Sequence, residues 1–425
     1  MKKLGKGKQG GLFSSAVLYT LANFVNKLIP FILLPLLTRY LSIEEYGIVT
    51  MFNATASFLI PLVGMSIPTA IIRRLADREN NSNSEYVFNC LMIALVATMV
   101  VAVVMLFAHD YVSAFTGVPG DLLVFECLYT IATVICQAVQ SVMQIREKVR
   151  LYAAFTNVDT LSNALLSVAL IVGLNMGLDG RIFGLVIAKT VLSIVGLVYL
   201  KKSIGLSPKA NIEHVREELF EFGLPLIPTQ IKTTVLTYTD KIFLTNLVSV
   251  GATGVYTVAD QFASPISFLV QSFNLAFVPW LFKKLADGNE AVNRKIVKLT
   301  YCYFMVVPLF SILWAWMSTY LIGWIAGESY VGATDYIMYL SIAYAFSGMH
   351  MMVVNYIYYA KKVKLYSLVT ITVIFSNVFL NFVFLQISGP VGAAQATLLA
   401  NVVSFVLTWL LAARVWKMPW NLLKK

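Results

Sequence analysis

Ionisable side chains stand inside long apolar runs of this 425-residue sequence, where a charge could bind a ligand or carry a proton. If these runs cross a membrane, each charge at mid-depth costs about 2.5–3.5 kcal/mol on insertion scales and therefore needs a partner or a function. The candidates for such a function are Lys27, Asp159, Lys189, Lys232, Asp240, Lys241 and Asp260.

Asp260 belongs to the most regular polar stripe in the sequence. Six polar residues step by three or four positions through an apolar run, which places them on one face of a helix. A carboxyl group on this face is a candidate for coupling to an ion or a proton; the alternative is a static ion pair with Lys241 or Lys27. The stripe consists of Thr257, Asp260, Ser264, Ser267, Gln271 and Asn274.

Two further pairs of charges have simpler interpretations. Asp240 and Lys241 are adjacent near the end of their run, which indicates a gate or a structural pair. Asp159 and Lys189 each lie eight residues into neighbouring runs, counted from opposite sides. At ~1.5 Å per residue in ~30 Å of hydrocarbon, their depths differ by about 6 Å, which favours a structural ion pair.

Lys27 and Lys232 are the least easily explained cations. Lys27 lies about 22 Å into its run at ~1.5 Å per residue, where it either contacts a ligand, reaches the far interface or forms an ion pair. Lys232 points some 160° away from the polar face of a straight helix at ~100° per residue, unless a kink at Pro225–Pro228 turns it; the alternative is a pair with a carboxylate. The amides expected to share the polar surface are Asn23, Asn26, Asn53, Gln230, Gln271 and Asn274.

The sequence contains none of the usual signatures of catalysis. It has no P-loop, and its three histidines are isolated, without an H-E-x-x-H pattern. The four cysteines stand in apolar runs without a C-x-x-C pair, so neither a disulfide framework nor a zinc site is expected. We therefore expect no enzyme, no metal site and no cofactor.

The composition is that of an integral membrane protein. Hydrophobic residues make up 59% of the chain and charged residues 12%, whereas soluble domains carry roughly 25% charged residues. Twelve apolar runs reach the ~20 residues that a helix needs to cross the hydrocarbon, so the expected fold is all-α. The runs are 12–38, 46–72, 86–108, 122–145, 151–175, 181–200, 218–247, 251–282, 296–323, 334–360, 365–387 and 391–413.

Lysine and arginine indicate the orientation of these runs. If the runs alternate in direction, 26 of the 32 basic residues fall on one side, and only Arg39 and Arg181 on the other; the remaining four stand inside runs. The positive-inside rule places the basic side and both termini in the cytoplasm. The formal net charge of +11 is thus a property of cytoplasmic loops and does not indicate nucleic-acid binding.

An internal repeat divides the chain. A shift of 207 positions aligns LTRYLSIEEYGIVT (37–50) with LTNLVSVGATGVYT (244–257), and 9 of 27 residues over 37–63 are identical. We expect two parallel six-helix bundles, 1–200 and 218–425, joined by a cytoplasmic linker at 201–217. Asn53 is the counterpart of Asp260 in this repeat. Because the polar stripes recur at equivalent places, a central water-filled cavity between the bundles is favoured over hydrogen bonds between packed helices.

Three segments resemble bacterial polysaccharide exporters, which flip lipid-linked O-antigen or capsule repeat units and belong to the multidrug/oligosaccharidyl-lipid/polysaccharide exporter superfamily. Their shared features are the EEYG loop at Glu44–Gly47, the proline-rich start of the seventh run and the Asp240–Lys241 pair. The segments are IPFILLPLLTRYLSIEEYGIVTMFNATASFLIPLVGMSIPTAIIRR (29–74), FGLPLIPTQI with YTDKIFLTNLVSVGATGVYTVADQF (222–231, 238–262), and GESYVGATDYIMYLSIAY (327–344).

This resemblance implies a flippase of the bacterial inner membrane that works by alternating access and is coupled to an ion. Its cargo would be a polyprenyl diphosphate-linked oligosaccharide for lipopolysaccharide or capsule, with membrane lipid and polysaccharide polymerase or assembly proteins as partners. Lys27 and Lys232 would then contact the anionic cargo. A drug or cation antiporter of the same superfamily is the alternative, and it would favour acidic residues in the cavity. A membrane glycosyl-polymerase or ligase would need a sizeable outer loop, which the predicted topology lacks.

Overall fold

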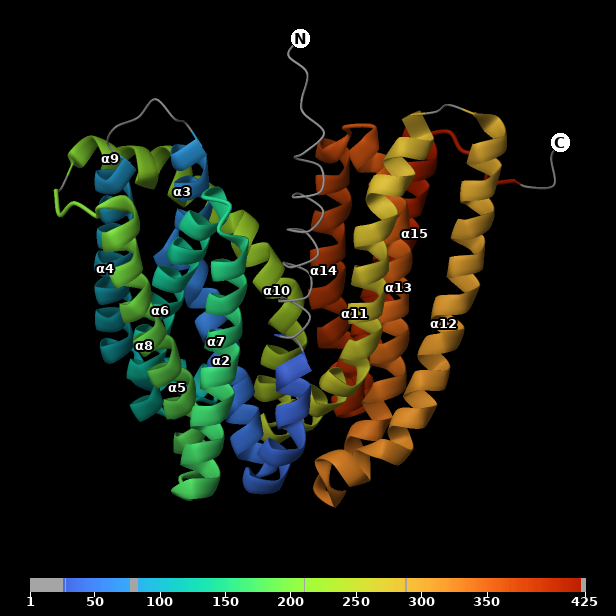
Figure 1. The fold of residues 1–425 in the computed structure, drawn as a ribbon. Coiled ribbons are helices and arrows are strands. Elements are labelled where there is room, and N and C mark those ends of the chain that lie inside the picture. The colour runs from blue at the N-terminus through green and yellow to red at the C-terminus, as the bar shows by residue number, and fades with distance from the viewer. Residues whose placement is uncertain (1–25, 27, 77–82, 210, 287–288, 422–425) are drawn as a thin grey trace, which may run out of the picture. The chain divides into compact units, whose positions relative to one another are not determined.

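The computed structural model describes residues 26, 28–76, 83–209, 211–286 and 289–421, without the side chains of residues 83, 217, 222, 232 and 233. Nearly all of this part of the chain is helical. It divides into two compact units, Met1–Thr234 and Val235–Lys425. The boundary between these units, at Thr234–Val235, lies within the helix α10, which Figure 1 labels.

The first unit contains a set of helices long enough to cross a membrane, joined by short helices. Within it α6 packs against α2, α3, α4 and α8, and α7 packs against α8. The described elements are the helix Leu28–Tyr40, α2 (Ile43–Gly64), α3 (Ile67–Ala76), α4 (Asn83–Phe107), α5 (His109–Thr116), α6 (Gly120–Ile145), α7 (Val149–Val168), η1 (Ala169–Gly173), α8 (Gly177–Ile204), α9 (Ile212–Arg216), η2 (Glu217–Gly223) and the first part of α10 (Leu224–Leu247).

The EEYG loop is the start of α2. Ser42 has extended backbone angles and its hydroxyl accepts a hydrogen bond from the backbone N–H of Glu45 at 3.2 Å. The Glu45 carboxylate accepts from the backbone N–H of Ser42 at 2.7 Å. This reciprocal capping box satisfies two backbone donors at the N-terminus of the helix and fixes where α2 begins.

The run expected over 46–72 is broken in two. Helix α2 ends at Gly64, Met65 and Ser66 have positive φ angles of 39° and 61°, and α3 begins at Ile67. Pro61 lacks an N–H for the carbonyl of Ser57. Thr234 of α10 donates a hydrogen bond to that carbonyl at 3.3 Å, so α10 replaces part of what the proline removes.

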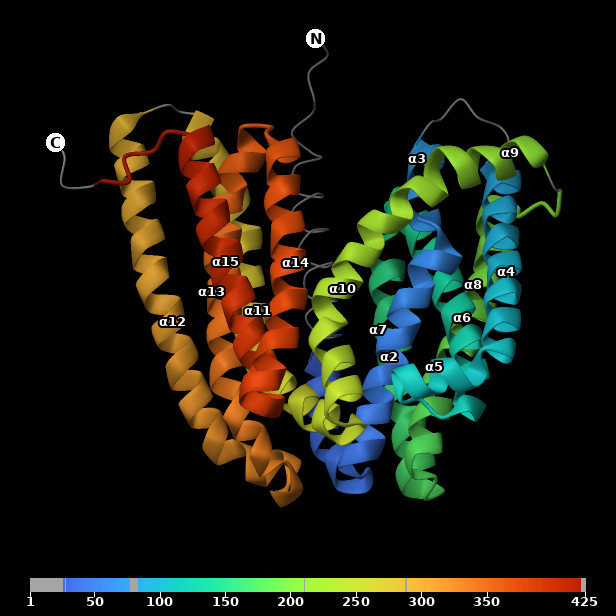
Figure 2. The same cartoon turned by 180° about the vertical axis from the view of Figure 1, so that it is seen from behind.

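The second unit contains the rest of α10 and five long helices. Helix α13 packs against α11, α12 and α15, and α14 packs against α15 (Figures 1 and 2). The elements are α11 (Val250–Ala286), α12 (Glu290–Ala326), η3 (Glu328–Ala333), α13 (Thr334–Tyr359), α14 (Val363–Ser388), η4 (Gly389–Val391) and α15 (Gly392–Val415).

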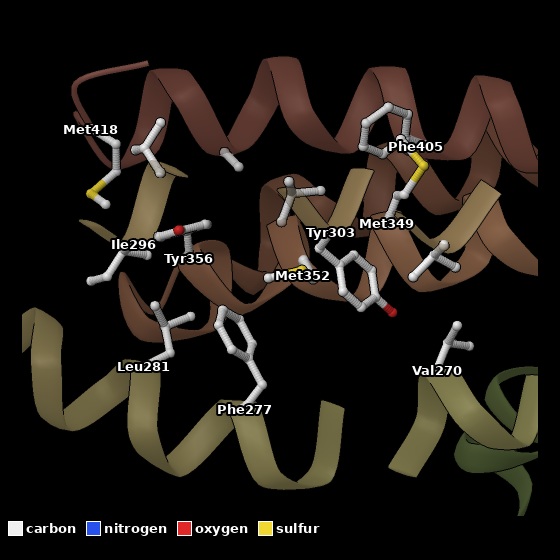
Figure 3. Close-up of a cluster of buried hydrophobic side chains, with 14 of the residues drawn as sticks. Val270, Phe277, Leu281, Ile296, Tyr303, Met349, Met352, Tyr356, Phe405 and Met418 are labelled. Carbon is white, nitrogen blue, oxygen red and sulfur yellow. The ribbon is translucent and has the colours of Figure 1, made fainter. Parts of the chain in front are cut away.

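The core of the second unit is aromatic and sulfur-rich. Phe277 of α11, Tyr303 of α12, Tyr356 of α13 and Phe405 of α15 are buried together, with methionines filling the spaces between them (Figure 3). Phe273 stacks on Tyr303 with 4.7 Å between ring centroids. The core is thus built from the inward faces of four long helices.

The outward faces of the helices are apolar as well. Val100 and Phe107 on α4 and Met305 and Trp324 on α12 are exposed. Surfaces of this kind require lipid as solvent. Nine helical segments among the described residues are long and apolar enough to cross a membrane, one of them containing both α14 and α15. The protein is an all-α integral membrane protein, as the sequence predicts.

The repeat found in the sequence coincides with helix boundaries. Helix α2 begins at Ile43 and α11 at Val250, 207 positions later. Helix α4 begins at Asn83 and α12 at Glu290, again 207 positions apart. The two copies differ in one place. Helix α2 breaks at Met65–Ser66, whereas α11 continues without interruption through the equivalent positions.

Candidate functional site

A buried charge cluster lies in the second unit, where α10, α11 and α13 meet. The Lys241 ammonium forms an ion pair with Asp260 Oδ2 at 2.9 Å, and the two side chains are 8% and 23% exposed. The Tyr344 hydroxyl of α13 donates to Asp260 Oδ1 at 2.5 Å. Asp260 is therefore partnered on both oxygens, and Lys241 pairs with it rather than with its neighbour in sequence.

Asp240 forms a second carboxylate site beside this pair. Its Oδ2 accepts hydrogen bonds from the hydroxyls of Tyr256 on α11 and Thr397 on α15, the latter at 3.0 Å. Its Oδ1 is buried and has no hydrogen-bond partner among the described residues. Asp240, Asp260 and Lys241 together carry two acids and one base, so these three ionised groups sum to one negative charge. Such a cluster can hold one proton or one monovalent cation.

A polar pocket of about 220 Å³ adjoins Asp240 within the second unit. Thr397 lines this pocket and also donates to Asp240, so one side chain connects the two. The His350 Nε2 and the Tyr366 hydroxyl are 3.0 Å apart in its wall. The other polar residues that line it are Ser347, Thr370, Asn377, Asn401 and Ser404.

The polar stripe of α11 stays half-buried along its whole length. Besides Asp260, it makes contacts along α11 and with α13. The Gln271 amide donates to the Ser267 hydroxyl at 2.8 Å, and the Asn274 oxygen accepts from the amide of Asn355 on α13 at 2.9 Å. The half-buried members are Thr257, Asp260, Ser264, Ser267, Gln271 and Asn274.

The first unit brings together two of the candidate charges. Lys189 on α8 forms an ion pair with Asp159 on α7, with side-chain exposures of 15% and 17%. The Lys189 ammonium also lies 6.0 Å from the ring centroid of Tyr129 on α6. The next residue of α7 after Asp159, Thr160, donates its hydroxyl hydrogen to the side-chain oxygen of Asn26 at 2.9 Å.

Two further amides of the first unit bind backbone or hydroxyl groups. The Asn53 amide donates to the carbonyl of Val49 at 2.8 Å, one turn earlier in α2. The Gln230 amide of α10 donates to the hydroxyl of Ser66, the residue at the break between α2 and α3. The Gln230 contact holds α10 against the break that follows α2, and Asn53 is half-buried within α2.

Three of the predicted contacts to the cargo lie outside what the structure describes. They are Asn23, Lys27 and the side chain of Lys232. Their roles, and that of a cavity between the two bundles, remain predictions from the sequence.

Glu126 is a buried acid that the sequence analysis does not single out. It lies in α6, is 0% exposed, and neither of its carboxyl oxygens has a hydrogen-bond partner within the described part of the chain. An acidic residue inside the run predicted over 122–145 was one available signal. A regular polar spacing like that around Asp260 was a second signal, because polar residues step by four and three positions along the same face of α6: Glu126, Thr130, Thr133, Gln137, Gln140 and Gln144.

The fold defines a class of protein, the multi-pass all-α membrane protein. The structure matches the lipid II flippase MurJ in its inward closed conformation with a TM-score of 0.76, at 16% identity, over 94% of this chain and 87% of that one. It matches the MATE multidrug transporter DinF-BH with a TM-score of 0.63, at 20% identity, over 97% of this chain and 98% of that one. At these identities the likeness shows the fold alone.

Sequence comparison gives the family. Residues 12–284 match the family described as "Polysaccharide biosynthesis protein", and the chain belongs to it. A relative from Haemophilus influenzae, "Lsg locus putative protein 1", is 25% identical over 393 residues, which cover 90% of this chain and 95% of that one. The protein is thus a multi-pass membrane protein of the polysaccharide biosynthesis family.

Proposed function

We propose that the protein moves lipid-linked oligosaccharides, carried on polyprenyl diphosphate, from the cytoplasmic to the outer leaflet of the bacterial inner membrane. The observation that carries this proposal is the family match over residues 12–284. The neighbour described as a lipid II flippase supports it at the level of fold. The product would be a repeat unit for O-antigen, lipopolysaccharide or capsule, delivered to a polysaccharide polymerase or to other assembly proteins.

The cargo would be held by cationic and amide side chains. A diphosphate brings negative charge into the membrane, and a lysine at mid-depth compensates it. We assign this role to Lys27 and Lys232, with Asn23, Asn26, Asn53, Gln230, Gln271 and Asn274 binding sugar hydroxyls. Both termini would lie in the cytoplasm, where the basic loops fall.

The cluster of Asp240, Lys241 and Asp260 would couple transport to an ion or gate it. With two acids and one base, it gains a compensating charge when it binds a proton or a monovalent cation. Such binding drives a cycle when the ion has different affinities for the two facing states. Tyr344 and Thr397 extend the contacts of the carboxylates to α13 and α15. A change in charge at the cluster would therefore alter hydrogen bonds among four helices, α10, α11, α13 and α15.

A drug or cation antiporter is the second candidate function. The polar pocket beside Asp240 and the fold of the MATE multidrug transporters favour it. Lys27 distinguishes the two candidates, because an added cation repels a cationic drug and attracts a diphosphate.

Substitution of Lys27 in cells tests the proposal. Lys27→Ala should abolish surface polysaccharide while the protein still reaches the membrane, and Lys27→Arg should retain part of the export. Asn246→Ala, at an exposed amide of α10, is a control that should export normally. Full export by the Lys27→Ala variant would remove the lysine from the mechanism.

A further inference from the structure

Glu126 stands apart from the other buried acids of the described chain by its surroundings. Asp159 is paired with Lys189, Asp260 with Lys241, and Asp240 accepts two hydroxyl donors. Glu218, also fully buried, accepts from the hydroxyl of Tyr86 at 2.5 Å. Glu126 is equally buried, but no described residue donates to either of its oxygens.

The face of α6 around Glu126 offers little to hold a negative charge. Thr130 lies one turn further on the same face, is also fully buried, and its hydroxyl has no partner among the residues that the structure describes. Cys127 is directed to Met105 of α4, with 3.4 Å between their sulfur atoms. An isolated carboxylate in such a place is so costly that the group takes up a proton instead.

The helices that pack against α6 carry charged groups, and these are engaged elsewhere. On α7 and α8, Asp159 and Lys189 pair with each other, and Arg181 donates to Asn163 at 2.8 Å and to Ser167 at 2.6 Å. On α5, His109 lies 3.1 Å from Asp110. Helix α2 presents Tyr46 near Arg181, α4 presents Met105, and α3 carries Arg73 and Arg74 in its last turn.

We propose that Glu126 is a proton-binding site of the transport cycle, protonated in this conformation and opened to water in the other. The proposal rests on the ion-coupled transport proposed above and assigns a proton to the first unit. A metal ion fits the site poorly, because a hard cation needs several oxygen ligands and Thr130 alone adds one. Among the described residues, no group of three His, Cys, Asp or Glu side chains could hold a metal.

The location of Glu126 suits such a role. It lies six residues into α6, about 9 Å from the start of the helix at ~1.5 Å per residue. Helix α6 contacts α2, α4 and α8, so any rearrangement of these helices changes the surroundings of the carboxyl group. Water then reaches Glu126, the proton leaves, and the different proton affinities of the two states give the coupling.

Infrared difference spectroscopy tests the protonation without any cargo. The parent protein at neutral pH should show the carbonyl stretch of a protonated acid, which is absent from Glu126→Gln. Transfer to heavy water should shift this band, because a site that opens during the cycle exchanges its proton. An ionised Glu126, or a band that never shifts in heavy water, would overturn the proposal.

A pH gradient across reconstituted vesicles tests the coupling. Flipping of a fluorescent polyprenyl diphosphate oligosaccharide by the parent should rise about tenfold with the gradient, as typical coupling energies allow. Glu126→Gln has nearly the same shape as the protonated acid, so it should fold, and its rate of flipping should be the same with and without the gradient. Glu126→Asp should respond in part.

Asp121→Asn, at an exposed acid in the first turn of the same helix, is the matched control and should respond as the parent does. If Glu126→Gln responds like the parent, or if the parent responds to sodium and not to pH, the assignment of the proton site is wrong. If the parent does not flip the lipid at all, the proposed function itself fails, and the infrared result still stands on its own.

Discussion

At the scale of single residues, charge pairing inside the membrane determines what each acid can do. Asp260 is bound by Lys241 and Tyr344, whereas Asp240 and Glu126 each keep an oxygen without a donor from the described residues. The three acids therefore differ although all stand in apolar helices. Asp260 is half-buried while Asp240 and Glu126 are buried, and the partners of each carboxyl group differ as well.

Replacing Asp260 separates coupling from binding. Asp260→Asn keeps the shape of the side chain and can still accept from Tyr344, but it removes the charge opposite Lys241. We expect this variant to bind cargo and to lose the response to the ion gradient that drives the parent. The measurement is flipping in vesicles with an imposed pH or sodium gradient. A variant with an unchanged response would leave Asp260 a static partner of Lys241.

The Asp159–Lys189 pair should contribute to stability rather than to transport specificity. Removing one partner from a buried pair leaves an uncompensated charge and costs about 3–5 kcal/mol. Asp159→Asn and Lys189→Met should each lower the free energy of unfolding by about this amount, and the double variant should recover most of it. Unfolding in mixed micelles provides the measurement. Additive losses in the double variant would show that the two side chains do not act as a pair.

At this scale the sequence gives the depth of each charge in the membrane and a few possible partners, but it does not decide among those partners. Position along a run gives the level of Asp159 and Lys189 in the membrane, so their proximity lies within its reach. The sequence offers Lys241 both Asp240 and Asp260 as partners, and the packing of α10 against α11, which no local pattern encodes, brings Lys241 to Asp260. Glu126 begins a polar stripe on α6, so the sequence can mark it, but only the packing of the described helices shows that none of them offers it a donor.

At the scale of elements, the breaks and close contacts of helices place the polar groups. Composition and length identify the long helices, because a period-free apolar run of this length has few other solutions. The break at Met65–Ser66 is different. Pro61 predicts a local distortion of the helix. The left-handed backbone of the residues after it depends on how α10 packs against the break through Gln230 and Thr234.

Close packing of α7 against α8 depends on Gly184. A Cβ atom there would lie 2.5 Å from the Ser167 hydroxyl oxygen and 2.8 Å from the Ser167 Cα, and the backbone cannot move aside without separating the helices. Gly184→Ala should destabilise the protein by about 1–3 kcal/mol, a typical cost of overpacking. Thermal unfolding in detergent measures the effect.

Gly173→Ala is the control for this prediction. A Cβ atom at Gly173 would meet no atom of the described residues within 4 Å. Because alanine loses less conformational entropy than glycine, the change should be neutral or slightly stabilising, by up to about 1 kcal/mol. Equal behaviour of the two variants would contradict the account of the α7–α8 contact.

At the scale of the whole molecule, the distribution of basic residues predicts the topology. Single cysteines at positions Ser82, Pro208 and Asn289 should react with a membrane-impermeant thiol reagent from the cytoplasmic side only. Those at Gly117 and Gly332 should react from the outside. Cys302 is exposed and must be replaced first, whereas Cys90, Cys127 and Cys136 are buried. One position on the wrong side would overturn the twelve-span topology.

The sequence predicts the fold and the family of this protein better than the nature of its cargo. The all-α membrane fold follows from composition and is confirmed. The family was inferred from the resemblance of the EEYG and proline-rich segments, and it is confirmed as well. The repeat of 207 residues reappears in the starts of two pairs of helices. The nature of the cargo does not follow from these features, because a fold hosts many functions and specificity depends on individual side chains.

Flipping by the purified protein tests the central claim most directly. Vesicles containing the protein and a fluorescent polyprenyl diphosphate oligosaccharide in both leaflets are treated with an impermeant quencher, and the unquenched fraction is followed in time. We predict that the protein makes the protected fraction accessible, that Lys27→Ala does so far more slowly, and that a cationic dye is not transported. Transport of the dye while the lipid-linked oligosaccharide stays protected would contradict the account and identify an antiporter.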